Sequence, residues 1–225
     1  MKIIADLEKE LGEDLDERRI LVVNLFMIAT LVNQEQQKEA LYRAIIPAVY
    51  AQYEGFIKKC FRILVEKINE NRVNIEKLPR ALRHNLLLCS LPQEFGKDGS
   101  AKLSLSKAVS AMNDLADDNI EILTSLVDLK PDRFTSSNLQ PKHIKQWMQE
   151  LGIDTTGLDG FEAALQDLVR KRHAFAHGEL MRILPENEAV FKRNYCEIPL
   201  EAMDFVFNKI LDFAAVIANS KELQK

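Results

Sequence analysis

The chain is poor in the residues that interrupt helices. Its 225 residues include only eight glycines and seven prolines, and these fall mostly between segments of helical periodicity. It also lacks a glycine-rich phosphate loop, a His-Glu-x-x-His helix, a Gly-x-Ser-x-Gly elbow and a Cys-x-x-Cys pair. Because each of these motifs carries the chemistry of a large enzyme class, their absence argues against a phosphate-loop enzyme, a zinc protease, an α/β-hydrolase and a thioredoxin-like oxidoreductase.

Cysteine is scarce as well. The three cysteines are far apart and odd in number, so they match neither a disulfide framework nor the ligand spacing of a zinc site. We interpret them as small buried apolar side chains of a protein in a reducing cytosol. They are Cys60, Cys89 and Cys196.

Long apolar runs are also missing. The most apolar run, residues 20–32, is too short to span a bilayer and contains Asn24 and Thr30. The sequence begins MKIIADLEKE, with an acidic residue by position 6 and no apolar stretch, so we expect no signal peptide. These features predict a cytoplasmic protein that has no membrane partner.

An excess of basic charge is absent too. The chain has 30 lysines and arginines against 34 acidic residues, which gives a net charge of −4. A broad, sequence-independent grip on nucleic acid needs a basic surface, so this balance argues against one and leaves room only for a local basic site. The shares of apolar residues, 47%, and charged residues, 28%, are those of an ordinary soluble globular protein.

The sequence does show helical periodicity along most of its length. We therefore predict one all-α domain over residues 1–225, a helical bundle with a loop-rich insertion at 92–140. Pro47 predicts a kink or a restart within the second helix, because proline removes a backbone donor and clashes with the preceding turn. Residues 182–197 look irregular, with room for a small hairpin. The expected helices cover residues 14–33, 36–69, 79–91, 104–127, 141–151, 160–178 and 200–219, and loops are expected at 92–100 and 128–140.

The end of the helix expected at 160–178 holds the most informative cluster. It contains Arg170, Arg172, His173 and His177, so half of the four histidines lie there. On an ideal helix Arg170, His173 and His177 share one stripe about 60° wide. Arg172 points elsewhere and joins His177 only if the last turn unwinds or a second copy shares the site. An arginine beside an imidazole suits phosphodiester chemistry; the alternative is a basic helix end that complements the helix dipole.

The two histidines are four residues apart, a spacing that allows a shared metal on one helix face. Glu179 is the best third ligand nearby, and it is a weak one. We therefore expect no metal and no other cofactor.

The stretch from Tyr50 to Lys58 is the second unusual feature. Glu54 and Lys58 form a favourable i,i+4 pair on the expected helix. Gly55 lowers helix stability by about 1 kcal/mol relative to alanine, so we expect another helix to approach closely there. Glu54 is a candidate contact for the arginine cluster across that approach; the alternative is a plain packing face with a solvated Glu54.

These stretches resemble a known superfamily. Arg172-His-Ala-Phe-Ala-His-Gly-Glu179 resembles the Arg-x4-His motif of the HEPN superfamily. Tyr50-Ala-Gln-Tyr-Glu-Gly-Phe-Ile-Lys58 is similar to a segment of its MAE-type branch. Ser137-Asn-Leu-Gln-Pro141, followed by Leu151-Gly-Ile-Asp154, is similar to the middle section of that branch. The similarity spans roughly residues 14–180, and it implies a HEPN-like bundle that forms a homodimer with two motifs facing one cleft.

The resemblance also implies a function. Many members are metal-independent endoribonucleases of toxin–antitoxin, abortive-infection or other defence systems, so RNA is the expected substrate and an antitoxin protein a candidate partner. Arg172 then corresponds to the phosphate-binding cation, His177 to the proton-transfer group and His173 to the polar motif residue. From geometry alone we keep Arg170 as a helper, together with Glu54 and Lys58.

Some features depart from the family pattern or leave the function open. Glu179 stands where toxins paired with nucleotidyltransferase antitoxins carry a tyrosine, which argues against control by nucleotidylation there. Some members have lost catalysis, so the alternative is a non-catalytic module that binds RNA, a nucleotide or a protein. A purely structural dimer is a third reading. The run 20–32 is apolar on more sides than one core face needs, so we expect part of it at an interface.

Overall fold

The structure is a computed structural model that describes residues 2–70, 93–95, 101–103, 134, 138–179, 183 and 187–219. The described part is all-α apart from two three-residue strands, as the periodicity predicted. Its elements are α1 (Lys2–Leu31), α2 (Glu35–Glu70), β1 (Gln93–Phe95), β2 (Ala101–Leu103), α5 (Pro141–Leu151), the 3-10 turn η4 (Leu158–Phe161), α6 (Glu162–Ala176), α7 (Glu188–Lys192), the π-helical turn η5 (Arg193–Glu197) and α8 (Ile198–Asn219).

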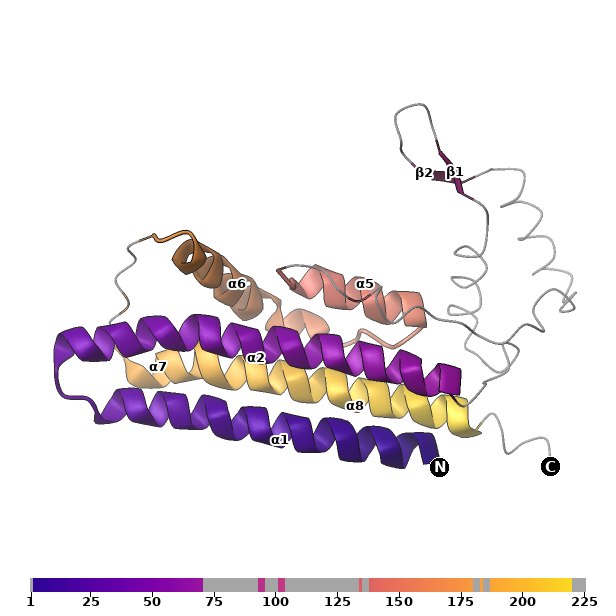
Figure 1. The fold of residues 1–225 in the computed structure, drawn as a ribbon, viewed down its shortest axis with the longest axis horizontal. Coiled ribbons are helices and arrows are strands. Elements are labelled where there is room, and N and C mark those ends of the chain that lie inside the picture. The colour runs from indigo at the N-terminus through magenta and orange to yellow at the C-terminus, as the bar shows by residue number, and fades with distance from the viewer. Residues whose placement is uncertain are drawn as a thin grey trace, which may run out of the picture.

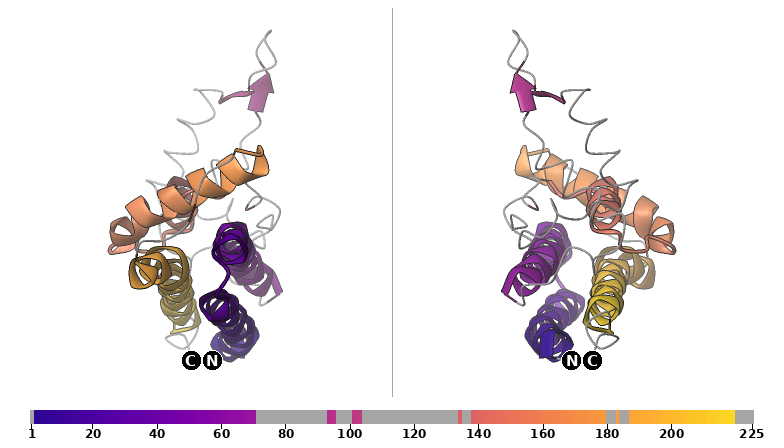
Figure 2. Two further views of the ribbon diagram at one scale, coloured as in Figure 1. Left: turned by 90° about the vertical axis from the view of Figure 1, so that its left-hand side faces the viewer. Right: turned by 90° about the vertical axis from the view of Figure 1, so that its right-hand side faces the viewer.

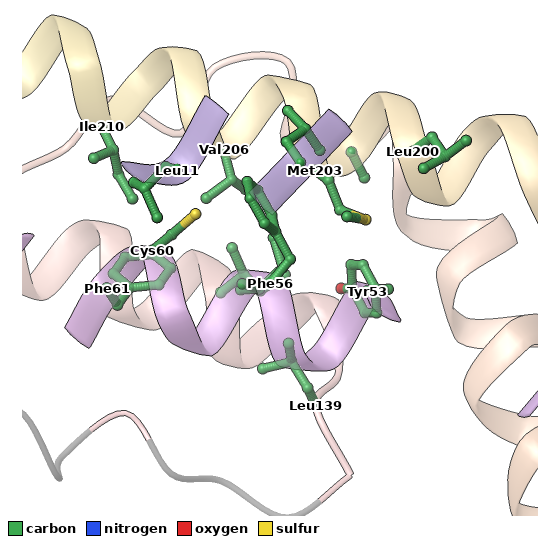
Figure 3. Packing of buried hydrophobic residues seen from close by; sticks show 14 of the residues in the cluster. Leu11, Tyr53, Phe56, Cys60, Phe61, Leu139, Leu200, Met203, Val206 and Ile210 are labelled. Atoms are coloured by element: carbon green, nitrogen blue, oxygen red, sulfur yellow. The ribbon is translucent and has the colours of Figure 1, made fainter. Parts of the chain in front are cut away.

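The long helices α1, α2 and α8 run side by side as a bundle, and α5 and α6 lie on one side of it, with α6 crossing the long helices obliquely (Figures 1 and 2). Each pair of the three long helices is in contact, and α6 packs on α2 and α8. Figure 3 shows the centre of the core, where Phe56 and Cys60 of α2 face Leu11 of α1 and Val206 of α8. Fully burying such an apolar side chain contributes about 1.5–3 kcal/mol, so this interface accounts for much of the stability of the bundle.

Helix α1 begins at Lys2, and the prediction of a start near residue 14 was wrong. Ile3, Leu7 and Leu11 are buried at helical spacing among acidic residues, and they anchor the early turns on the bundle. The opposite side of the second half of α1 is apolar and exposed. We call this surface the outer face of α1, and it consists of Ile20, Leu21, Val23, Met27, Ile28 and Leu31.

Helix α2 runs without a break from Glu35 to Glu70 with Pro47 inside it, so the predicted restart does not occur. Proline removes one backbone hydrogen bond there, but Ile45, Ile46 and Val49 are buried on both sides of it. Their burial holds the flanking turns in one helix.

The hairpin suggested for 182–197 is also wrong where that segment is described, because residues 188–197 form α7 and η5. Asn187 caps α7, since its side-chain oxygen accepts hydrogen bonds from the backbone N–H groups of Ala189 and Val190 at 2.9 and 3.3 Å. Tyr195 and Cys196 are buried in the π-helical turn, which fixes it on the bundle.

Other sequence predictions have mixed outcomes. Helices α5 and α8 confirm the predictions at 141–151 and 200–219. Within the expected loop 92–100 lies β1, which pairs antiparallel with β2, with Gln93 opposite Leu103. The helices expected at 79–91 and 104–127 lie outside the described residues, as does most of the insertion predicted at 92–140. The single-domain organisation therefore stays a prediction.

Two of the three cysteines lie in the described part of the chain. Cys60 and Cys196 are free and buried, as predicted, whereas Cys89 lies outside the described residues. Burial raises the pKa of the Cys60 thiol well above its ordinary value and that of Cys196 to about 12. Among the described helices, none has the length and apolar character needed to cross a bilayer.

Candidate functional site

Helix α6, which carries the Arg-x4-His motif, ends at a glycine. Gly178 has φ +75°, and its N–H donates to the carbonyl of Phe175 at 3.1 Å, while the N–H of Glu179 donates to the carbonyl of Ala174 at 3.0 Å. These two bonds form a Schellman motif, which satisfies the last carbonyls of the helix. His177 is the C-cap residue, so the end predicted near Gly178 is confirmed and the motif histidine sits where the helix stops.

Arg172 reaches from α6 across to α2 and to the segment before α5. One terminal nitrogen of its guanidinium donates to the side-chain oxygen of Asn138 at 2.6 Å. The guanidinium carbon lies 5.0 Å from the centre of the Tyr50 ring, within cation–π range. Among the described residues no carboxylate pairs with Arg172. Within that part of the chain, the two groups that hold the guanidinium in place are therefore both neutral.

Asn138 adopts an unusual backbone conformation. Its φ is +58°, the left-handed region that asparagine tolerates better than most residues. The next residue, Leu139, is buried, and its N–H donates to the carboxylate of Glu54 at 3.4 Å. Glu54 also accepts from Lys58 at 2.9 Å. The segment that carries Asn138 is thus fastened to α2 one turn beyond Tyr50.

The predicted contact between Glu54 and the arginine cluster is therefore indirect. Glu54 pairs with Lys58 and the Leu139 backbone, and it reaches Arg172 only through the neighbouring Asn138. The close helix approach predicted at Gly55 is confirmed, but the approaching helix is α1: a Cβ added at Gly55 would lie 3.1 Å from a guanidinium nitrogen of Arg18. This contact lies on a different side of α2 from Tyr50.

Tyr50 is a fully buried platform beneath Arg172. Its hydroxyl makes no hydrogen bond of good geometry among the described residues. Burial, followed by the nearby Glu54 carboxylate, raises the pKa of this hydroxyl, while the charge of Arg172 lowers it. The hydroxyl therefore stays neutral near pH 7, so the ring supports the guanidinium through its π face.

His173 and His177 are both exposed and lie together, as the helical spacing predicted. Their ring centres are 4.3 Å apart and the rings are inclined by 61°. Arg170, expected on the same stripe, instead pairs with Asp167 at 2.5 Å, and its side chain is 71% exposed. Of the two arginines, the structure ties Arg172 to the surrounding elements and leaves Arg170 in a local pair on its own helix.

Asp167 belongs to a separate network that fastens α6 to η5. It accepts a hydrogen bond from the Tyr195 hydroxyl and lies 3.1 Å from the amine of Lys171. Although burial raises the pKa of this carboxyl, the hydrogen bonds from Arg170, Tyr195 and Lys171 outweigh it and lower the pKa. The network fixes the orientation of the helix that carries the motif.

Sequence reasoning missed two residues near the motif. It assigned no role to Asn138, although the segment around it was singled out. It also missed Arg43 on α2, whose guanidinium carbon lies 5.5 Å from the centre of the Phe175 ring. Residues 43, 50 and 54 fall on one stripe of an ideal helix, so the spacing did contain a signal for Arg43.

A metal shared by His173 and His177 would require at least one further ligand side chain. Within the part of the chain that the structure describes, no three histidine, cysteine, aspartate or glutamate side chains gather as a metal ion would require. Glu179, the weak third ligand considered with His173 and His177, does not complete such a group.

An all-α bundle in which a helix ends on an Arg-x4-His motif is the arrangement expected of the HEPN class. The family model described as HEPN_MAE_28990-like HEPN matches residues 7–215, and the chain belongs to this family. The resemblance noted from the sequence is thus confirmed at the level of the branch. No curated protein and no solved structure matches the chain.

Proposed function

We propose that this HEPN protein is a metal-independent endoribonuclease that acts in the cytoplasm as the toxin of a toxin–antitoxin or phage-defence system. One observation carries the proposal: an arginine whose contacts within the described part of the chain are all neutral lies on the same helix end as two exposed imidazoles. That combination offers a cation for a phosphate and a group that moves protons near neutral pH.

The reaction is attack of a ribose 2′-hydroxyl on the adjacent phosphate. His177 takes the proton of the 2′-hydroxyl or gives a proton to the departing 5′-oxygen, a role that contributes about 10²–10⁴ in rate. Arg172 stabilises the negative charge that builds on the phosphate oxygens. The new bond joins the 2′-oxygen to phosphorus and the bond to the 5′-oxygen breaks, which yields a 2′,3′-cyclic phosphate and a 5′-hydroxyl.

The contact between the two imidazoles supports a dimeric site. With ring centres 4.3 Å apart, His173 and His177 leave no room for a phosphate between them. In an in-line displacement the attacking and leaving oxygens lie on opposite sides of phosphorus. The histidines of one protomer therefore transfer a proton at only one of these two oxygens. A second copy of the motif in a homodimer supplies the proton-transfer group for the other oxygen.

The outer face of α1 does not serve this purpose. Helix α1 contacts α2 through Gly55 and Gln52, whereas Arg172 contacts it through Tyr50, on another side of the helix. Figure 2 shows α1 and α6 separated by the rest of the bundle. A dimer formed through the outer face of α1 would hold the two motifs apart. The apolar run that suggested an interface in the sequence thus lends no support to the composite site.

The test uses purified protein and RNA in the presence of EDTA. We expect the wild type to cleave RNA and His177→Ala to be slower by about 10²–10⁴. Arg62→Ala, which removes an exposed arginine paired with Glu66 elsewhere on α2, is the control and should cleave normally. Equal cleavage by wild type and His177→Ala would rule out this histidine as the catalyst.

Growth gives a second test that separates catalysis from binding. Expression of the wild type alone should arrest cells, and Arg172→Ala should relieve the arrest. RNA binding that depends on Arg172 without cleavage or growth arrest would instead identify a non-catalytic HEPN module.

A further inference from the structure

The residue that fixes Arg172 most directly is Asn138, 34 positions earlier in the sequence. Its side-chain oxygen accepts a hydrogen bond of 2.6 Å from the guanidinium, and the Tyr50 ring lies beneath the same group. A guanidinium held at an edge and on a face has lost much of the freedom of an arginine side chain. The remaining donors of its planar fork then keep a fixed direction.

The backbone at Asn138 is shaped for this contact. A φ of +58° is unfavourable for most residues, and asparagine is among the few that adopt it readily. The following N–H, of Leu139, is bonded to Glu54, and Leu139 itself is buried in the core. The turn is therefore fastened to α2 at the point where it presents its carboxamide to Arg172.

The chemistry of the acceptor matters as much as its position. An aspartate at this place would form a stronger, charge-assisted bond, but it would also neutralise the arginine. The carboxamide of Asn138 orients the guanidinium and leaves its net charge unchanged. Among the residues described, the other contact of Arg172, the Tyr50 ring, is equally neutral.

We propose that Asn138 is a positioning residue, which fixes the Arg172 guanidinium on the Tyr50 ring without neutralising it, so that the arginine meets the phosphate of the RNA in one orientation. The inference deepens the proposed function and rests on it for its consequence in catalysis. The orientation itself is a property of the protein alone and can be measured without RNA.

The first measurement is the rotation of the Arg172 guanidinium, followed by NMR on protein labelled with ¹⁵N-arginine and assigned with Arg172→Lys. We expect slow rotation in the wild type and in Asn138→Asp, and fast rotation in Asn138→Gly. Glycine adopts the left-handed backbone without strain and removes only the carboxamide. Unchanged rotation in Asn138→Gly overturns the inference, whatever the cleavage rates show.

The second measurement is RNA cleavage by the same proteins, with melting temperatures recorded alongside. Asn138→Gly should lower kcat roughly tenfold or more, because misplacing a positioned group slows the chemical step. Asn138→Asp should raise KM and also lower kcat, because it keeps the orientation but pairs the charge that binds the phosphate and stabilises the transition state. Asn24→Asp adds the same charge on the exposed side of α1 and should behave as wild type.

The two readouts separate the possible failures. If both Asn138 variants lose cleavage only in proportion to a loss of melting temperature, Asn138 is structural and the inference is wrong. If the wild type cleaves no RNA while rotation still depends on Asn138, the positioning stands and the proposed endoribonuclease function fails.

Discussion

Arg18 and Arg172 both lay a guanidinium against α2, from different sides, and they are held in opposite ways. Arg18 donates to the carboxylate of Asp14 at 2.7 Å and to both the backbone and side-chain oxygens of Gln52 at 3.0 Å. Arg172 donates to the neutral Asn138 and lies over the Tyr50 ring, and the described residues give it no acidic partner. Arg18 is a neutralised cation at a helix–helix contact, whereas Arg172 is an anchored cation that keeps its charge.

This difference is what we expect between a structural arginine and one that binds an anion, as proposed for Arg172. A partly buried charge is stable when an opposite charge and hydrogen bonds compensate it, as Asp14 and Gln52 do for Arg18. A site that binds anions needs the reverse, a cation whose position is fixed by groups that leave its charge uncompensated. Burial and packing alone would not distinguish the two, since both side chains are partly buried.

The largest effect should come from removing Arg172. Arg172→Ala is expected to slow RNA cleavage by about 10²–10³, as loss of a charge-stabilising donor does in other enzymes. Its free energy of unfolding should fall by only about 1 kcal/mol, because one hydrogen bond and one ring contact are lost. Cleavage assays and urea unfolding of the same protein measure both. A loss of stability large enough to unfold the variant would contradict the functional reading of this arginine.

Removing Arg18 should have the opposite profile. Arg18→Ala leaves Asp14 partly buried beside one remaining partner, Lys59, at 3.0 Å. We expect the free energy of unfolding to drop by about 2 kcal/mol, less than for a fully buried pair because the two side chains are 20% and 17% exposed. Cleavage by the folded fraction should be unchanged. Urea unfolding at a temperature where the variant is folded gives the first value, and a rate corrected for that fraction gives the second.

The acid side of the stability profile should reflect Asp14. Burial raises the pKa of this carboxyl, but the hydrogen bonds from Arg18 and Lys59 outweigh it and lower the pKa below its ordinary value. Its contribution is thus fully present above the unfolded pKa, about 3.9, and is lost as the pH falls through the lower folded pKa. Asp14→Asn should flatten the fall in unfolding free energy below pH 4. An equally steep fall in both proteins would show that Asp14 is not the group responsible.

The sequence predicted the parts of the fold that depend on local chemistry. Pro141 and Gly152 mark the ends of α5, and Gly178 marks the end of α6, because a fixed φ or a left-handed φ is required at these positions. The proline rule was less reliable where tertiary packing decides: Pro47 does not restart α2, because buried neighbours keep the helix continuous.

The candidate site shows the same division. The pairing of His173 with His177 follows from their spacing, since residues four apart share a helix face. The same rule favoured Arg170 over Arg172 as their companion, whereas the structure anchors Arg172. Its bond to Asn138 spans 34 residues and depends on how residues 138–140 are fastened to α2. Helical periodicity in the sequence cannot predict such a long-range contact.

The smallest effect concerns Gly55, the single glycine of α2. It tests directly how α2 accommodates Arg18 as compared with Arg172. Alanine there gains up to about 1 kcal/mol of helix propensity, but its Cβ would lie 3.1 Å from a guanidinium nitrogen of Arg18 and weaken the bonds to Gln52. Gly55→Ala should therefore change the unfolding free energy by less than about 0.5 kcal/mol in the wild type. Combined with Arg18→Ala, it should stabilise by about 0.5–1 kcal/mol, since the obstructing group is gone.

A double-mutant cycle in urea measures that coupling. If Gly55→Ala has the same effect in both backgrounds, the Arg18 side chain does not require a glycine at position 55. The contact is then incidental to the packing of α1 on α2. A coupling near 1 kcal/mol would show that α2 makes room for its structural arginine by omitting a side chain. On its other side, α2 supports Arg172 with a large side chain, the Tyr50 ring. Helix α2 would then treat the two arginines differently through two residues only five positions apart.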